Sequence, residues 1–134
     1  MSKFEFGRLI NNWDAWSLEP SLDQSHHLPE PEYVNLFNLG LKGKMKHPAE
    51  FNQWLADVTR ALDSVGLRAL ISDTARRPVR LDNSSMRWVL YSKQVALWLE
   101  TTMTVDMAAS IKAQPGPLIF ADSFMKKAKR CFQV

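Results

Sequence analysis

The chain has 134 residues, of which 46% are hydrophobic and 23% are charged, the size and composition of one globular domain rather than of two domains or a disordered chain. A single cysteine, Cys131, excludes an intramolecular disulfide, and we expect a reducing, cytoplasmic location because neither a signal peptide nor a run approaching ~20 apolar residues is recognised. The charge is uneven: residues 1–40 carry two basic and six acidic side chains, whereas the remainder carries fifteen basic and eight acidic ones.

The first predicted element is an amphipathic helix over residues 3–16, with a strand over KFEF as the alternative. Its apolar residues recur at spacings of three and four, and they are Phe6, Leu9, Ile10, Trp13 and Trp16. Residues 17–32 contain three prolines and no hydrophobic period, which predicts a long extended loop. Within a single globular domain over residues 1–134, we therefore expect residues 1–32 to act as an arm on a body formed by 33–134.

Two helices are expected next. A short one begins at Pro31 and runs to Leu41, where Gly40 and Gly43 weaken and then end it. The other begins at Pro48, ends at Gly66, and is the clearest element of the chain. Its apolar face comprises Phe51, Trp54, Leu55, Val58, Ala61, Leu62 and Val65. The following LRALIS, residues 67–72, fits either a short strand or more helix.

Residues 86–105 are the main ambiguity. Apolar residues lie nearly all round this segment, as is typical of a central buried helix, and one of residues 82–85 can cap it. The alternative is a β-hairpin, since RWVLYS and VALWLETTMTV are rich in β-branched and aromatic residues. We favour the helix, because the segment lacks glycine, proline and a clean alternation.

Two further helices complete the prediction. Thr104 is expected to cap a helix over residues 105–114, ended by Pro115 and Gly116. Asp122 or Ser123 is expected to cap the last one. That helix places Phe124, Met125, Ala128 and Phe132 on one side and Lys126, Lys127, Lys129 and Arg130 on the other. The predicted fold class is therefore mostly α, with five or six helices and a long N-terminal loop; an α+β fold with a hairpin over 86–105 is the alternative.

Ten basic side chains form three clusters along the sequence. Forked arginines and flexible lysines are the types that contact phosphates and carboxylates, so clusters that share one face would bind nucleic acid or an acidic protein surface. The alternatives are ordinary surface charge and pairing with the acidic arm of the same chain. The clusters are Lys42, Lys44 and Lys46; Arg76, Arg77 and Arg80; and Lys126, Lys127, Lys129 and Arg130. No zinc-finger spacing, RNA-recognition signature or clear helix-turn-helix accompanies them.

The remaining candidate residues give little support to an enzyme. Four of the five tryptophans are expected in the core, which leaves Trp16 as a partner contact. His26 and His27 are adjacent and cannot easily bind one metal ion, and Cys131 has no histidine near it in sequence. No phosphate-binding glycine loop, nucleophile elbow or dinucleotide motif occurs. We predict no catalytic residue, no metal and no small-molecule cofactor.

These patterns predict a non-catalytic binding protein that acts through a basic surface on nucleic acid or on an acidic macromolecule. The alternative is a protein–protein interaction or self-assembling structural protein that uses the acidic, aromatic N-terminal arm, with a homo-oligomer as one outcome. A small metal-dependent or cysteine-dependent enzyme is the least favoured hypothesis. Small, cysteine-poor chains without enzyme motifs are common among viral, phage and mobile-element products, and we expect such an origin here.

Overall fold

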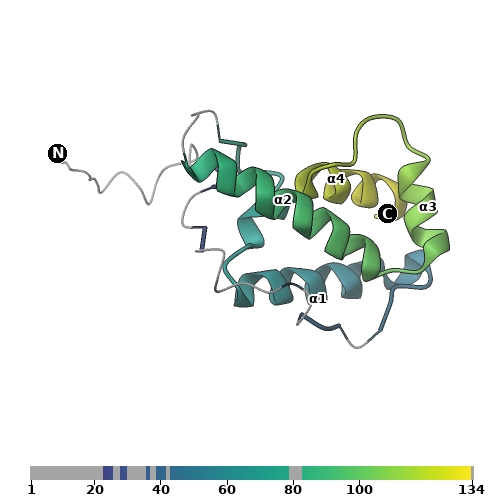
Figure 1. Cartoon of the computed structure of the whole chain (residues 1–134). Coiled ribbons are helices and arrows are strands. Elements are labelled where there is room, and N and C mark those ends of the chain that lie inside the picture. Colours follow the sequence, from purple (N-terminus) through teal and green to yellow (C-terminus); the bar gives the residue numbers. More distant parts are fainter. Residues whose placement is uncertain are drawn as a thin grey trace.

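The computed structural model describes residues 23–25, 28, 29, 36, 39–41, 43–78 and 83–133. Within these residues the secondary structure is helical, with single β-bridges and no strand, so the prediction of a mostly α fold is confirmed (Figure 1). The elements are the α-helices α1 (Phe51–Ser64), α2 (Asn83–Thr101), α3 (Val105–Lys112) and α4 (Ala121–Phe132), with the 3₁₀ turns η4 (Pro48–Glu50) and η5 (Arg68–Ile71). The predicted helix over 3–16 and most of the one from Pro31 to Leu41 lie outside the described residues.

Helix α1 follows the sequence pattern closely. Pro48 opens η4, and the Glu50 carboxylate accepts a hydrogen bond from the backbone N–H of Lys46 at 2.7 Å, which stabilises the start of the helix. The apolar face is buried through Phe51, Trp54, Val58 and Leu62. Gly66 has a φ of 78°, a conformation that favours glycine, and the predicted helix end there is confirmed.

Helix α2 runs unbroken over residues 83–101, so the hairpin alternative for 86–105 is wrong. Its inner side is buried, mainly through Trp88, Tyr91, Val95, Trp98 and Leu99. Burial of these side chains against α4 and η5 fixes the segment as a helix.

Helices α3 and α4 begin in different ways. The Thr104 side chain accepts from the backbone N–H of Met107, as predicted. The predicted capping of α4 by Asp122 or Ser123 is wrong, because α4 begins at Ala121 and its N-cap residue is Phe120. The N–H of Ala121 instead donates to the Ser92 Oγ of α2 at 3.0 Å, so a tertiary contact satisfies this first turn.

The placement of Lys127 on the polar side of the last helix is also wrong. Its side chain is 5% exposed, and its ammonium group donates to the backbone carbonyl of Gly116. The loop after α3 folds over this part of α4 and supplies this carbonyl acceptor. A buried ammonium group requires such hydrogen-bond acceptors.

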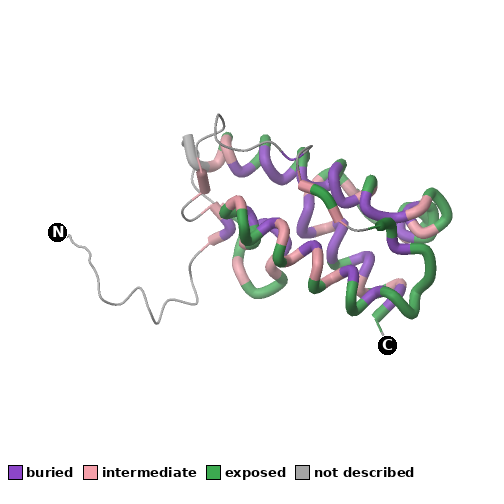
Figure 2. Tube along the Cα trace, turned by 90° about the horizontal axis from the view of Figure 1, so that it is seen from below, coloured by how far each residue is buried: buried purple, intermediate pink, exposed green. Residues whose placement is uncertain are grey.

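A hydrophobic core lies between α1, α2 and α4, and exposed residues gather on the outer sides (Figure 2). Three tryptophans belong to it, as the sequence predicts, and each indole N–H reaches an oxygen. Trp54 donates to the Thr102 Oγ1 at 2.8 Å, Trp88 to the Gln24 Oε1 at 2.9 Å, and Trp98 to the Leu39 carbonyl at 3.2 Å. Among the helices of the described residues, none combines the length and the apolar character that a membrane crossing requires.

Candidate interaction surfaces

The arginine loop, residues 72–78, is tied to the body by Arg77. The Ser72 Oγ accepts from the N–H groups of Thr74 and Ala75, both at 3.1 Å, so a local turn shapes the loop. The Arg77 guanidinium then forms a two-pronged ion pair with the Asp122 carboxylate, at 2.7 and 2.6 Å. It also lies 5.4 Å from the centre of the Trp88 ring, within cation–π range. Arg77 is thus engaged within its own chain.

The Asp122 carboxylate is the buried half of this pair. Burial alone would raise its pKa, but hydrogen bonding and the charge of Arg77, with smaller contributions from the Ser123 N–H and Gln24, hold the pKa below its ordinary value of 3.8. Asp122 therefore carries its charge inside the fold because Arg77 neutralises it.

Gln24 joins the arm to this ion pair. Its side chain is 1% exposed, and its amide nitrogen donates to the carbonyls of Ser72 and Ala75, each at 3.2 Å. Its amide oxygen accepts from Trp88, and its backbone N–H donates to the Arg76 carbonyl at 2.6 Å. The described residues of the proposed arm thus pack on the body, and the position of Asp23–Ser25 is fixed beside the first turns of α2.

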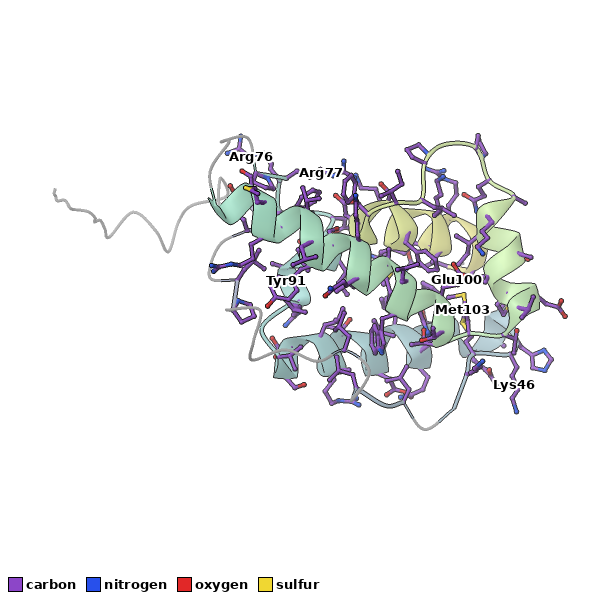
Figure 3. All side chains as sticks on the ribbon, viewed as in Figure 1. Lys46, Arg76, Arg77, Tyr91, Glu100 and Met103 are labelled. Carbon is purple, nitrogen blue, oxygen red and sulfur yellow. The ribbon has the colours of Figure 1, made fainter. Side chains whose placement is uncertain are left out.

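Lys46 and Arg77, which belong to two of the basic clusters, lie at opposite ends of the molecule. Lys46 is exposed and lies beside Met45, which pairs with Met103 just after α2. Arg77 lies near Trp88 at the start of α2, and 13 residues of helix separate the two ends by ~20 Å. Figure 3 shows Lys46 at the opposite end from Arg76 and Arg77. The structure does not bring these clusters onto one shared patch.

The C-terminal cluster lies closer to the arginine loop but is partly neutralised. Lys129 forms an ion pair with Asp73 at 3.2 Å, and the side chain of Arg130 donates to the Gln114 Oε1 at 3.3 Å. Lys126 and Arg130 are exposed, as are Arg76 and Lys44 in the other clusters. Lys42, Arg80 and Trp16 lie outside the described residues, as do His26 and His27.

A groove of about 550 Å³ opens beside the arginine loop. Residues 72–75 form one wall, and Arg68 and Lys129 contribute positive charge, whereas Asp23 and Asp73 contribute negative charge. Since the charges of the lining balance, this groove does not favour a strongly anionic ligand.

The outer side of α2 carries the largest exposed apolar side chains of this helix. Met86 is 72% exposed, Leu90 45% and Leu97 69%, and they recur at helical spacings of four and seven residues. We call Met86, Leu90 and Leu97 the outer row of α2; Lys93 interrupts it, and Val89 lies at its edge. Beside Leu97 a depression of about 340 Å³ extends the surface towards Leu118 and Ile119. Exposed apolar residues that gather on one side of a helix are typical of contact surfaces.

The structure describes the surroundings of two kinds of group considered for catalysis, metal ligands and Cys131. No group of three or more His, Cys, Asp and Glu side chains in this part of the chain could hold a metal ion. The Cys131 thiol lies beside the Gln114 amide and donates to the Ser110 carbonyl at 3.5 Å, and neither of these groups is an acid–base partner of the kind that activates a nucleophile.

Comparison with known proteins adds no relationship: no family model matches the chain, and neither a curated protein nor a solved structure does.

Proposed function

We propose that this protein is a non-catalytic binding protein whose partner is another protein chain, docked on the outer row of α2. The observation that carries the proposal is the exposure of Met86, Leu90 and Leu97 on one side of a helix whose other side is in the core. A protein partner gains most from such a surface, because covering apolar side chains is the main driving force of protein association.

The placement of the basic residues supports a protein partner over nucleic acid. Phosphate binding requires several free cations on one surface, and here Arg77 pairs with Asp122, Lys127 is buried, and Lys46 lies at the far end. Binding of nucleic acid through Arg76, Lys126 and Arg130 stays a prediction, and the experiment below includes it as an outcome.

The test is affinity capture with the full-length chain from cells that encode it. The variant Leu90→Glu with Leu97→Glu places two carboxylates in the outer row. Its matched control is Asn52→Glu with Gln53→Glu, which adds two carboxylates to the exposed side of α1. We expect the control to retain the protein captured by the wild type and the outer-row variant to lose it at least tenfold. Circular dichroism checks that both variants keep their helices.

Two outcomes would overturn the proposal. One is the same captured protein, in equal amount, with both variants. The other is captured nucleic acid that both variants retain, that added salt releases, and that Arg76→Ala with Lys126→Ala reduces, since this is the pattern of phosphate contacts.

A further inference from the structure

Two neighbouring depressions lie where the end of α2 meets α3. The larger, of about 340 Å³, opens beside Leu97, and the smaller, of about 170 Å³, opens beside Val105. Glu100 and Lys112 line both of them, so the ion pair that these side chains form at 2.7 Å is a shared wall. Figure 3 shows Glu100 at this end of α2. The outer row therefore continues into two depressions beyond Leu97.

Apolar side chains line most of each depression. Phe124 lines the larger one and Met103 the smaller one, and both are 2% exposed. Ile119 at the larger depression is 56% exposed, and Val105 at the smaller one is 83% exposed. The apolar surface thus extends from the buried interior of each depression to its rim. Depressions of this kind hold the bulky apolar side chains that anchor a protein partner.

The charged groups around the depressions are mainly cationic. Lys93 lines the larger depression, Lys44 the smaller one and Lys112 both, and Glu100 is the one carboxylate in either lining, which leaves a net charge of +2. Lys112 pairs with Glu100. Lys44 and Lys93 are exposed, and neither forms an ion pair within the described part of the chain. An apolar surface with a cationic rim is complementary to an apolar segment that carries carboxylates.

We propose that this surface binds an acidic amphipathic helix of the partner. The inference rests on the proposed function, because it names the chemistry of the partner segment that covers the outer row. Met86, Leu90 and Leu97 accept the apolar face of the helix, and a bulky apolar side chain near one of its ends enters the depression beside Leu97. Carboxylates beside that face then lie near Lys93 and Lys44.

The outer row favours a helix over an extended segment. Met86, Leu90, Lys93 and Leu97 follow a four–three–four spacing, which is the spacing along which two helices pack. From Met86 to Leu97 the row extends ~17 Å along the axis of α2. An extended segment commonly binds by pairing with the edge of a sheet, and the described residues contain single β-bridges but no strand.

The exposed side chains also favour an acidic protein segment over nucleic acid. Unpaired bases bind by stacking on exposed aromatic rings, whereas Leu97, Val105 and Ile119 are aliphatic. A phosphate backbone would neutralise the lysines and leave these side chains in contact with water. An amphipathic helix covers the apolar side chains and neutralises the lysines together.

Synthetic peptide helices test the inference with the full-length chain. The acidic peptide has about 18 residues, or ~27 Å of helix, with leucines at the four–three–four spacing, glutamates beside them and a hydrocarbon staple on its opposite side. The basic peptide has lysines in place of the glutamates, and the polar peptide has serines in place of the leucines. Fluorescence anisotropy measures the affinity of each peptide.

Two charge-reversal variants accompany the wild type. Lys44→Glu with Lys93→Glu changes the rim of the depressions. Its matched control, Arg68→Glu with Lys126→Glu, reverses two exposed cations on η5 and α4 that line neither depression. Circular dichroism checks that both variants keep their helices.

We expect the acidic peptide to bind the wild type at least tenfold more tightly than either other peptide in about 50 mM salt, where screening is weak. The rim variant should bind the basic peptide more tightly than the acidic one, and the control should keep the preference of the wild type. Equal affinities of the three peptides, or no binding, would overturn the inference. The same reversal in the control would also overturn it, since only net charge would then matter.

A single-stranded oligonucleotide is the remaining probe. We expect it to bind the wild type at least tenfold more weakly than the acidic peptide. Binding as tight as that of the acidic peptide, and lost in Lys44→Glu with Lys93→Glu, would overturn the inference, because the lysines would then serve phosphates without apolar anchors.

The two proposals fail separately. If the acidic peptide has no advantage but Leu90→Glu with Leu97→Glu still loses the captured protein, the acidic helix is wrong and the proposed function is retained. If the acidic peptide binds as expected but capture does not depend on the outer row, the proposed function is wrong and the preference of this surface for an acidic helix is retained.

Discussion

The two sides of α2 are made of similar residues and meet different surroundings. Trp88, Val95 and Leu99 on the inner side are at most 5% exposed, whereas Met86 and Leu97 on the outer side are about 70% exposed. Helix α4 and η5 cover the inner side, and no other described element covers the outer row. Apolar residues on both sides of the segment favour burial of the whole helix. Because α4 and η5 pack against one side, only that side is covered by described elements.

The polar groups of the two sides differ as well. On the inner side the Ser92 Oγ accepts from Ala121, the Trp88 indole donates to Gln24, and the Tyr91 hydroxyl donates to the Pro29 carbonyl at 3.1 Å. The outer side carries the exposed Lys93 and Gln94. Buried polar groups need specific hydrogen-bond partners, so the inner side of α2 can pack in only one arrangement. The outer side has no such requirement and can contact any apolar surface of complementary shape.

The largest expected effect comes from two leucines that are two residues apart. Leu99 is fully buried, so Leu99→Ala should lower the free energy of unfolding by about 2–5 kcal/mol, the usual cost of a buried leucine. Leu97→Ala should cost at most about 1 kcal/mol, because its side chain is mainly exposed in the described part of the fold. Urea unfolding followed by circular dichroism measures both. Equal losses would show that the outer row is as well packed as the core.

The next effect tests whether the polar contacts of the inner side matter. Gln24→Ala leaves the Trp88 indole N–H and the carbonyls of Ser72 and Ala75 without their partner, and we expect a loss of about 1–3 kcal/mol in unfolding free energy. The matched control is Gln53→Ala, an exposed glutamine on α1, for which we expect less than about 0.5 kcal/mol.

The same experiment has a local readout. Amide hydrogen exchange over residues 72–77 should accelerate in Gln24→Ala and stay unchanged in Gln53→Ala, because Gln24 holds this loop through two side-chain bonds and one backbone bond. If neither variant loses stability or protection, the arm does not contribute to the inner side of α2.

Sequence patterns predicted α1, α2, α3 and α4 because their signals are local. The face of α1, the glycine end at Gly66 and the Thr104 cap each depend on residues within one or two turns. The helix over 83–101 was identified by what it lacks, namely glycine, proline and alternation. Signals that depend on so few neighbouring residues can be recognised without knowing the tertiary structure.

The polar contacts of Gln24 and Arg77 could not be predicted in the same way. Gln24 meets Trp88 across 64 residues, and Arg77 meets Asp122 across 45, so no spacing in the sequence relates them. A lone glutamine in a proline-containing loop reads as a surface residue. Lys127 was misplaced for a similar reason, because the loop that buries it follows a different helix.

The exposure of the outer row could not be predicted from the sequence either. An all-round apolar helix is typical of a fully covered position, and the pattern alone gives no reason for Leu97 to be exposed when Leu99 is buried.

The smallest expected effect concerns the ion pair between Arg77 and Asp122. Asp122→Asn removes the carboxylate that pairs with Arg77, and because the Arg77 side chain is 45% exposed, we expect a loss of only about 1 kcal/mol at pH 7. The pH dependence is the sharper measurement. The pKa of Asp122 is lowered in the fold, so on acidification the unfolded chain binds its proton first, and stability falls as the pH drops below 3.8.

Urea unfolding at pH 7 and at pH 3 should therefore show that the wild type loses more stability than Asp122→Asn over this interval. The Asp73 carboxyl, whose pKa Lys129 lowers through a hydrogen bond and its charge, leaves some acid sensitivity in the variant, and Asp73→Asn serves as the matched control. Because the Asp73 side chain is 55% exposed, its pair should matter less. Equal losses of acid sensitivity in Asp73→Asn and Asp122→Asn would contradict a special role for the Arg77–Asp122 ion pair in stabilising the packing on the inner side of α2. The difference between the two sides of α2 would then depend on apolar packing alone.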